Sequence, residues 1–501
     1  MREADTDSGV GTEAGIQIEI RGIIDAALRG ELTETLAARV YELGREATIA
    51  FSLAITAHAT SRGGAGPHTP SASIPVYAKP PAKKRRGKPG GRDGHEGHRR
   101  PTPPPDRVEV VEELEVCPGC GTPVLPARRR RKRTIEDIPA DMKVEAVQHD
   151  IPQQWCPCCK THVEPRMAAA MPGATLGNGV TALAVVMHYG LGLTIEQVRE
   201  IFASQLRTGI SAGGLVDMWH RAAGVLLAWY ERIGAEARNA ATLNADETGW
   251  RVNGDTHWLW CFCNSHNCYY MIDESRGSGV LKKFFSESFK GVLMSDFWAP
   301  YQSVVLAEGG PGRGGGERQC CLAHLMRELD HVDADRLPHK PPDRAREWSA
   351  FVKMLRRLLR DGIRLRRRPD FTPERYRPRI RRIDERLIAL AEASYDDEDA
   401  SRLASRLSRH RDGLFTFLDR PEADWNNNFA ERQIRPAVIL RKNSQCNRSE
   451  RGAATQAVLM SVYRTLKLRG LDPRATITQA LRTWSETGSL PPLPCPAVAE
   501  G

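Results

Sequence analysis

Three acidic residues that lie far apart in the sequence have the type and the local setting of a shared metal site. Asp246 and Asp296 each end an apolar run that is typical of a β-strand, and Glu431 lies in a helix-like stretch. Hard cations such as Mg2+ or Mn2+ need oxygen ligands of this kind. A single acid at a strand end is usually only solvated, so the hypothesis depends on all three. In a basic chain, the set points toward metal-assisted phosphodiester chemistry.

The charge of the chain indicates a polyanionic partner. Among 501 residues, 72 Lys and Arg stand against 62 Asp and Glu, which leaves a net charge of +10. A modest surplus can serve solubility alone, but dense basic runs more often serve nucleic acid. The densest run is expected to contact DNA through Arg128, Arg129, Arg130, Arg131, Lys132 and Arg133. With 41% apolar residues, a chain of this length should fold into about two to four domains.

The sequence predicts a cytoplasmic protein, associated with the bacterial nucleoid if its partner is DNA. No run approaches the roughly 18 apolar residues that a membrane span needs, so no membrane partner is expected. The N-terminus carries Glu3, Asp5 and Asp7 instead of a basic-then-apolar secretory signal. In a reducing compartment, the 12 Cys are better read as thiols or metal ligands than as disulfides.

Two Cys pairs in residues 108–166 predict a zinc ribbon. Each pair has the C-x-x-C spacing with a turn-forming Pro inside it, and the gap between the pairs fits a ribbon with a hairpin insertion. Such knuckles are typical of a tetrahedral structural Zn2+. The expected ligands are Cys117, Cys120, Cys156 and Cys159. Cys158 could replace Cys159, and the alternative is unligated thiols in a remnant ribbon.

The segments around this ribbon are predicted from composition and periodicity. Residues 16–60 have a helical pattern that fits a short coiled coil or an ordinary amphipathic helix. Residues 61–107 form a basic linker rich in Gly and Pro. Residues 172–236 read as helices, with starts at Thr194 and Ser211 joined by a short Gly-bearing turn. This pattern suggests a helix-turn-helix that binds DNA, although most such pairs merely pack.

From residue 240 the pattern changes to an α/β order. An Asn253-Gly254 turn between two apolar runs predicts a hairpin. The expected order is three strands, a helix and a strand, with an acid ending the first and the fourth strand. That order opens a ribonuclease H-like fold. The predicted strands cover residues 242–246, 250–252 with 257–263, 268–272 and 291–295.

A basic helical insertion explains why Glu431 comes so late in the chain. One α/β core does not need the chain that separates it from Asp296, so residues 325–410 are predicted to be inserted. The catalytic core would then comprise residues 240–324 and 411–470, and residues 471–501 would form a C-terminal tail. The fold class expected is a multidomain α/β protein.

Several blocks of the chain resemble insertion sequence 66 family transposases. These blocks are Asp246-Glu247-Thr248-Gly249, Asp296 with Tyr301, Cys321-Leu322-Ala323-His324 with Arg327, and Asn427-Asn428-Phe429-Ala430-Glu431-Arg432 with Ile434-Arg435-Pro436 and Arg441-Lys442-Asn443. The last block is the most specific. The resemblance extends over about residues 30–485 and keeps the order of the family's blocks.

The resemblance implies a DDE transposase with a ribonuclease H-like core. Asp246, Asp296 and Glu431 would bind two Mg2+ (or Mn2+) ions, one activating water or a 3′-hydroxyl and the other stabilising the leaving oxygen. The enzyme would bind terminal inverted repeats, nick the element's ends and join the 3′-OH to target DNA. The zinc ribbon and helix-turn-helix would recognise the repeats, and the basic insertion would clamp DNA.

Further partners and contacts are also implied by this resemblance. Joining two DNA ends suggests a homo-oligomer, and accessory proteins of the same element are plausible partners. Arg435 and Lys442 would contact DNA, although Arg435 lies four residues after Glu431 and could pair with it instead. Asp296-Phe297-Trp298 departs from the Asp-Gly-Tyr common in the family, which puts substrate contacts in doubt more than the chemistry.

Three other functions compete with DNA transposition. One is a DNA-binding protein with the same fold and no transposition activity. The second is a nuclease that only hydrolyses, and the third is a glycosidase with a carboxylate pair. The glycosidase leaves the basic runs and the Cys pairs unexplained.

Overall fold

The computed structural model describes most of the chain beyond residue 102. The described residues are 23, 34–43, 48–49, 51–52, 103–108, 110, 112–126, 132, 134–135, 138, 142–308 and 315–496. Most of the predicted N-terminal helix and of the linker 61–107 therefore lies outside the described residues, although a helix α2 (Glu34–Glu42) falls within 16–60. Of the basic run at 128–133, only Lys132 is described, and it is exposed.

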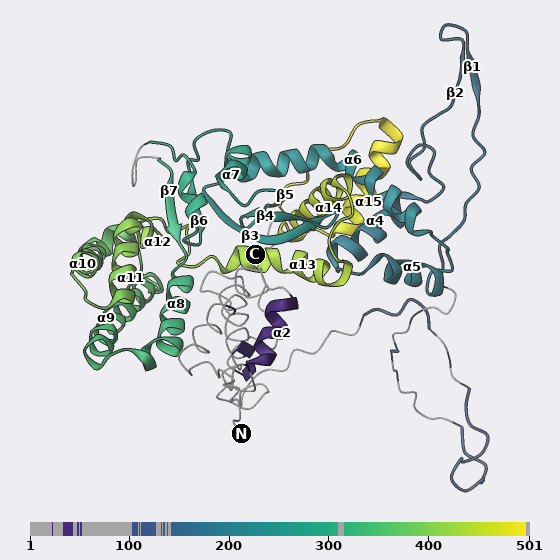
Figure 1. Cartoon of the computed structure of the whole chain (residues 1–501). Coiled ribbons are helices and arrows are strands. Elements are labelled where there is room, and N and C mark those ends of the chain that lie inside the picture. The colour runs from purple at the N-terminus through teal and green to yellow at the C-terminus, as the bar shows by residue number, and fades with distance from the viewer. Residues whose placement is uncertain are drawn as a thin grey trace, which may run out of the picture. The chain divides into compact units, whose positions relative to one another are not determined.

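The chain divides into two compact units. Among the described residues, the first unit includes residues 167–193 and 219–496, and the second includes those of 103–166 with 194–218. The first unit contains a five-stranded mixed sheet of order β5-β4-β3-β6-β7 (Figure 1). Its strands are β3 (Thr242–Val252), β4 (Asp255–Cys263), β5 (Cys268–Asp273), β6 (Val292–Ser295) and β7 (Glu317–Cys320).

The predicted order of three strands, a helix and a strand is confirmed. β3, β4 and β5 are antiparallel, helix α7 (Ser278–Phe284) follows, and β6 pairs parallel to β3. The hairpin turn is also confirmed: Asn253 and Gly254 adopt φ values of 51° and 89°. Positive φ at both turn positions matches the right-handed twist of the strands and suits Asn followed by Gly.

The predicted end of the first strand at Asp246 is wrong. β3 continues to Val252 because Asp246 pairs with Cys261 and every residue to Val252 keeps a partner on β4. The pairing of β3 with β6, however, stops at Asn244. Asp246 therefore lies just beyond the parallel ladder although it is inside a strand.

The two faces of the sheet are covered by different helices. On one face, α7 closes a core that includes Leu243, Phe262 and Leu293. The other face meets α13 (Asn428–Ser444) and α14 (Glu450–Leu468), which contact β3 and β5. Two hydroxyls of α14 accept N–H groups of the edge strand β5: Ser461 from Tyr270 at 2.8 Å and Thr465 from Cys268 at 3.0 Å. Because these hydroxyls occupy two N–H groups of the edge strand, they oppose pairing of β5 with a further strand.

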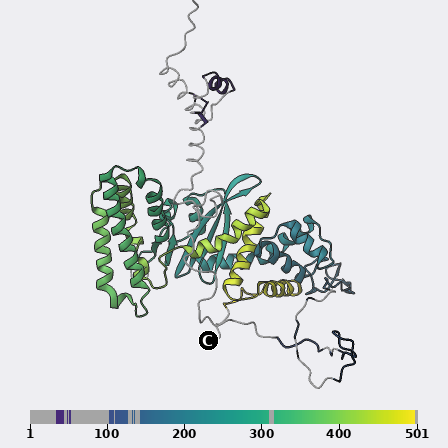
Figure 2. The ribbon, with the colours of Figure 1, turned by 90° about the horizontal axis from the view of Figure 1, so that it is seen from below.

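The predicted insertion is helical, and it shares its core with the sheet. Figures 1 and 2 show its long helices side by side in a bundle. They are α8 (Leu322–Asp335), α9 (Pro342–Arg366), α10 (Pro373–Glu392) and α11 (Glu398–Arg409), followed by α12 (Thr416–Asp419). One hydrophobic cluster joins Leu355 and Leu403 of this bundle to Val292 and Met294 of β6.

The predicted helical region 172–236 is distributed over both units. It forms α4 (Asn178–Val185), a π-helix η3 (Val186–Gly190), α5 (Ile195–Ser204) and α6 (Ala212–Arg238). The start at Thr194 is confirmed by a capping box, in which Thr194 and Gln197 exchange hydrogen bonds. The start at Ser211 is confirmed by its hydroxyl, which accepts the Gly214 N–H at 3.0 Å.

The predicted C-terminal tail is part of the first unit's core. Helix α15 (Pro473–Thr487) packs on α4, where Asn178 donates a hydrogen bond to Ser485 at 3.1 Å. Ile477 and Leu481 of α15 are fully buried. No helix among the described residues has the length and apolar character to span a membrane.

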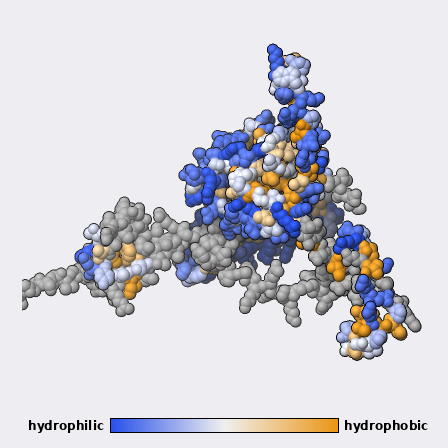
Figure 3. Space-filling view, turned by 90° about the vertical axis from the view of Figure 1, so that its right-hand side faces the viewer, coloured by the Kyte–Doolittle hydropathy of each residue, from blue (hydrophilic) through white to orange (hydrophobic). Residues whose placement is uncertain are grey.

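The second unit contains the two Cys pairs. A short hairpin, β1 (Gln154–Cys156) with β2 (Thr161–Val163), surrounds the second pair. Large hydrophobic side chains of this unit are exposed, among them Leu125 at 84% and Trp155 at 56%. Figure 3 shows hydrophobic residues exposed among hydrophilic ones. The region therefore has little apolar core of its own.

The shared core predicts that the insertion and the sheet unfold together. Leu355→Ala, at a fully buried position of α9, should lower the free energy of unfolding by about 2–5 kcal/mol. The neighbouring Met354→Ala, at a side chain that is 50% exposed, should change it by less than about 0.5 kcal/mol. Urea unfolding followed by circular dichroism and tryptophan fluorescence measures both. A separate transition for the bundle would contradict the shared core.

Candidate active site

Asp246 and Asp296 come together because of the parallel register of β3 and β6. Asn244 pairs with Met294 at the end of the β3–β6 ladder, so each acid follows the last residue of this parallel ladder by two positions. Side chains alternate along a strand, so residues two apart point to the same face. The electrostatic influence of Asp296 on Asp246 reflects this proximity. The structure thus brings together two of the three predicted acids.

Both Asp carboxylates have a raised pKa in a buried setting. Burial is the largest cause that raises the pKa of Asp246 well above its usual range, followed by the charges of Glu247, Asp296 and Glu431. Burial and the Glu247 charge raise the pKa of Asp296 to about 7, although it accepts the Trp298 N–H at 2.8 Å. Among the described residues, no cationic side chain forms an ion pair with either Asp.

Glu431 occupies the first turn of α13, where the helix dipole favours a carboxylate. Its Oε1 accepts a hydrogen bond from Arg327 Nη2 at 2.7 Å, and His324 Nε2 lies 3.8 Å away. Both partners come from α8. Glu431 therefore pairs with Arg327 and not with Arg435, which is exposed.

Asn427 fixes where α13 begins, a role that sequence reasoning missed. This side chain is 2% exposed; its Nδ2 donates to the Ala245 carbonyl at 2.8 Å, and its Oδ1 accepts from Asn244 at 2.9 Å. Its backbone N–H donates to the sulfur of Cys321 at 3.1 Å. Asn427 thus ties the residue before Asp246 to the helix that carries Glu431. The available signal was Asn244, a polar residue in a buried strand that must find a partner.

Glu247 is a structural acid on the opposite face of β3 from Asp246. It accepts two hydrogen bonds from Arg276, at 2.8 and 2.9 Å, and one from the Tyr301 hydroxyl at 2.5 Å. The Arg276 guanidinium lies between the rings of Trp258 and Trp298, 4.5 and 4.1 Å from their centroids. The Glu247 carboxylate holds Arg276, and Arg276 holds the Trp298 ring by a cation–π contact. The backbone N–H of Trp298 in turn orients Asp296.

Phe297, which departs from the Asp-Gly-Tyr common in the family, and Leu322 both have packing roles here. Phe297, next to Asp296, is 8% exposed and belongs to the core shared with the insertion. Leu322 is fully buried in the same cluster. Apolar residues at these positions therefore connect the site to the helical bundle.

The carboxylate oxygens of the acids suit a divalent cation, but the side chains are not yet arranged as a complete metal site. Among the described residues, no three His, Cys, Asp or Glu side chains gather as a ready metal site. The Asp pair nevertheless has the chemistry of such a site, since two adjacent carboxylates disfavour each other's charge and a cation would relieve this. Glu431, held by Arg327, is the acid that would have to turn toward it.

The other predicted site residues are spread more widely. Lys442 of α13 is exposed, whereas its neighbour Arg441 donates to Thr248 at 3.2 Å and to the Gly249 carbonyl. In the second unit, Cys117 N–H donates to the Thr122 carbonyl, and Cys159 N–H donates to the sulfur of Cys156 at 3.4 Å. Arg128, Arg129, Arg130, Arg131 and Arg133 lie outside the described residues.

The chain is similar to known proteins over much of its length. The model of the family described as "Transposase IS66 family" matches residues 173–455. The chain is 25% identical over 402 residues to the uncharacterized protein y4jD of Sinorhizobium fredii (strain NBRC 101917 / NGR234), covering 75% of this chain and 76% of that protein. It is 22% identical over 411 residues to y4hP of the same strain, covering 76% and 73% of the two chains.

The raised pKa of Asp296 predicts a pH-dependent cost to stability. Its folded pKa, about 7, exceeds the ordinary carboxyl value, so the folded state holds an extra proton and stability falls as pH rises toward 7. Without divalent metal at pH 8, Asp296→Asn should be more stable than wild type by roughly 1–3 kcal/mol, and the gain should vanish near pH 4. Urea unfolding at both pH values measures this. Asp255→Asn, at an exposed residue of β4, is the control. An equal effect of Asp296→Asn at both pH values would contradict the assignment.

Proposed function

The chain belongs to the IS66 family of transposases, and from this premise we propose that it cleaves and joins DNA strands at Asp246, Asp296 and Glu431. The observation that carries the proposal is the convergence of β3, β6 and α13. The parallel register aligns the two Asp, and Asn427 ties the start of α13 to the strand that carries Asp246. The order of antiparallel strands, helix and parallel strands supports a ribonuclease H-like core.

The three carboxylates would hold Mg2+ or Mn2+, two ions per active site. When bound, these ions would supply Lewis-acid activation of the attacking oxygen and stabilisation of the leaving oxygen. Asp296 holds a proton near neutral pH, so binding should release that proton and strengthen as pH rises through about 7. Arg327 holds Glu431 at 2.7 Å in this structure, and this pair would have to open for the third carboxylate to join the two Asp.

The substrate would be the terminal inverted repeats of an insertion sequence, whose freed 3′-OH is joined to target DNA. Two DNA ends must meet, which favours a homo-oligomer on DNA, and accessory proteins of the element are further candidate partners. The basic insertion, with Arg435, Lys442 and the run at 128–133, would hold the backbone. A protein that does this work would act at the bacterial nucleoid, in the cytoplasm.

We propose that α5 and the beginning of α6 serve as the helix-turn-helix. Arg199 of α5 donates to the Ile210 carbonyl at 2.9 Å and so fixes the turn that precedes α6. A fixed turn between two helices is what a recognition helix needs to enter the major groove. The competing function, DNA binding without transposition, keeps this element but needs no acid triad.

The two Cys pairs support a structural Zn2+ in the second unit. Hydrogen bonds from Thr122 lower the pKa of the Cys120 thiol, and those from Cys159 lower that of Cys156, which favours the thiolate that binds zinc. The Cys159 side chain contributes to the second effect, which favours Cys159 over Cys158 as the ligand. The exposed hydrophobic residues of this unit fit a domain that folds around its metal.

The acid triad predicts a complete loss of both chemical steps on substitution. With Mg2+ and DNA that carries the element's ends, Asp296→Asn or Glu431→Gln should reduce strand cleavage and joining by about a thousandfold or more. DNA binding should persist in each variant, and Asp255→Asn should cleave like wild type. Gel analysis of labelled ends measures cleavage and joining. Cleavage by either triad variant would remove that residue from the site, and wild-type binding without cleavage would support the competing function.

The zinc proposal predicts a difference between two neighbouring cysteines. Purified protein should contain about one equivalent of zinc. Cys159→Ser should lose it because a zinc ligand is removed, whereas the matched Cys158→Ser should keep it. Elemental analysis of freshly purified protein measures the metal. Zinc retained in Cys159→Ser and lost in Cys158→Ser would transfer the role to Cys158, and zinc-free wild type would end the proposal.

A further inference from the structure

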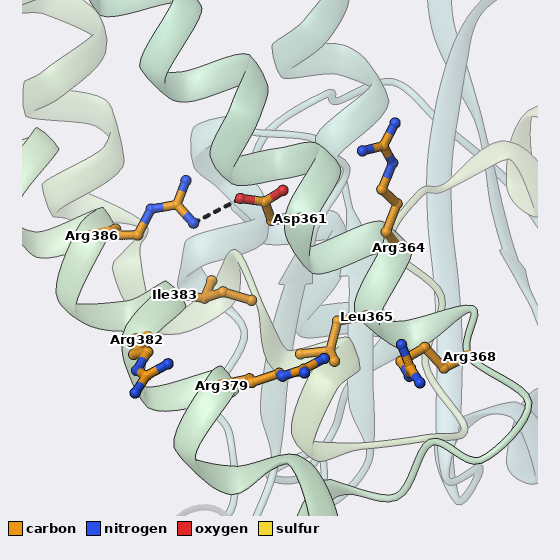
Figure 4. Close-up of a pocket in the computed structure, with 8 residues that line it drawn as sticks. All are labelled: Asp361, Arg364, Leu365, Arg368, Arg379, Arg382, Ile383 and Arg386. Atoms are coloured by element: carbon orange, nitrogen blue, oxygen red, sulfur yellow. Dashed lines mark hydrogen bonds and ion pairs between the residues drawn. The ribbon is translucent and has the colours of Figure 1, made fainter.

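An arginine groove lies between α9 and α10 of the insertion bundle (Figure 4). Its volume is about 360 Å3. The groove is lined by Asp361, Arg364, Leu365, Arg368, Arg379, Arg382, Ile383 and Arg386. Five of these eight residues carry a positive charge and one a negative charge. The site is separate from the acid triad, and sequence analysis did not predict it as a groove.

Helical spacing explains how the two helices present these residues. Asp361, Arg364 and Leu365 follow positions i, i+3 and i+4, which share one face of α9, and Arg368 lies just after this helix ends at Arg366. Arg379, Arg382 and Arg386 repeat the pattern on α10. Leu365 and Ile383, 6% and 4% exposed, form an apolar floor between them. The arginines therefore form the rim of a groove that has a packed base.

Most of the positive charge in this arginine groove is not neutralised. Arg386 pairs with Asp361 at 2.8 Å, as Figure 4 shows, and Arg368 pairs with Asp370 at 3.2 Å. Arg364, Arg379 and Arg382 form no ion pair with any carboxylate in the described part of the chain.

Several other arginines of the same bundle form ion pairs. Arg356 pairs with Asp330 and Asp333, and Arg377 pairs with Asp419 at 2.6 Å. Arg357 and Arg381, outside the groove, form no ion pair within the described residues, so the groove is distinguished by gathering three unpaired arginines around one apolar base.

Like charges held together repel one another, so the arrangement favours an anionic ligand. Guanidinium groups match phosphate oxygens with paired hydrogen bonds. From Arg379 to Arg386, seven residues of helix span about 10 Å. Phosphates of one DNA strand advance about 3.4 Å along the duplex axis. The row of arginines on α10 therefore matches a run of about three phosphates better than a single small anion.

We propose that the arginine groove binds the sugar–phosphate backbone of DNA, independently of base sequence. This inference rests on the proposed function in DNA transposition and assigns the backbone contact proposed there for the basic insertion to one groove and its named residues. The paired N–H donors of each guanidinium match phosphate oxygens, which are the same in every base sequence, and the lining offers five of these groups. The helix α9 shares its hydrophobic cluster with Met294 and Phe297, which flank Asp296, so groove and acid site belong to one packed body.

The test compares a groove variant with a matched control in the full-length protein. The groove variant is Arg364→Gln, Arg379→Gln and Arg382→Gln together, and the control is Arg356→Gln with Arg377→Gln. Fluorescence anisotropy with labelled duplexes, one carrying the element's end and one unrelated, gives Kd between about 50 and 300 mM salt. The groove variant should lower the slope of log Kd against log salt by about 2–3, one for each lost phosphate contact. Its affinity at low salt should fall by more than about tenfold on both duplexes.

Two further variants and readouts make the outcome decisive. Replacing the same three arginines with Lys should keep most of the salt slope because the charge remains, and circular dichroism should show that all variants fold. A wild-type slope in the Gln variant, or a loss no larger than that of the control, would overturn the groove. A loss confined to one duplex would also contradict backbone contact. If the groove result holds but wild type does not cleave DNA with Mg2+, the proposed function fails and the groove stands.

Discussion

The pairing of β3 with β6 is the constraint on which the candidate site depends. Only Thr242 to Asn244 pair in parallel with Val292 to Met294, yet this short ladder sets the level at which both Asp residues emerge. A shift by one residue would turn one of the two carboxylates to the other face of the sheet. Asn427 positions the start of α13 relative to these strands, because its side-chain amide hydrogen-bonds to Ala245 and Asn244 at the same level of the sheet.

The acidic residues of the site and those beside it differ in how far their charges are neutralised. The Asp pair is left without a cation among the described residues, whereas adjacent Glu247 is fully satisfied by Arg276 and Tyr301. Neighbouring acids on one strand thus have opposite roles: Glu247 holds the loop after β6 through Trp298, and Asp246 stays available. A site of this kind costs stability in the absence of metal, and the divalent cation that we propose for it would relieve this cost.

The insertion is more than an appended domain. Its helices complete the core on the side of β6 and β7, and Gln319 of β7 bonds to both Leu414 and Phe417 at the point where the chain returns. α8 also supplies Arg327, which holds Glu431. The long separation between Asp296 and Glu431 in sequence is therefore closed by packing. The arginine groove lies in the same bundle. The proposed DNA contact and the residue that holds Glu431 therefore belong to one packed element.

The sequence by itself determined the hairpin turn at Asn253-Gly254, the helix starts at Thr194 and Ser211 and the family of the chain, and it predicted the three acids as the candidate site. These features depend on local φ preferences, capping and residue order, which can be recognised in the sequence without knowledge of the fold. It placed the end of the first strand wrongly, because continuation from Asp246 to Val252 depends on pairing with β4. Only the tertiary structure decided that Glu431 pairs with Arg327, that Asn427 anchors α13 and that arginines of two helices share one groove. Each of these is a contact between distant segments, fixed by register and packing that no local pattern encodes.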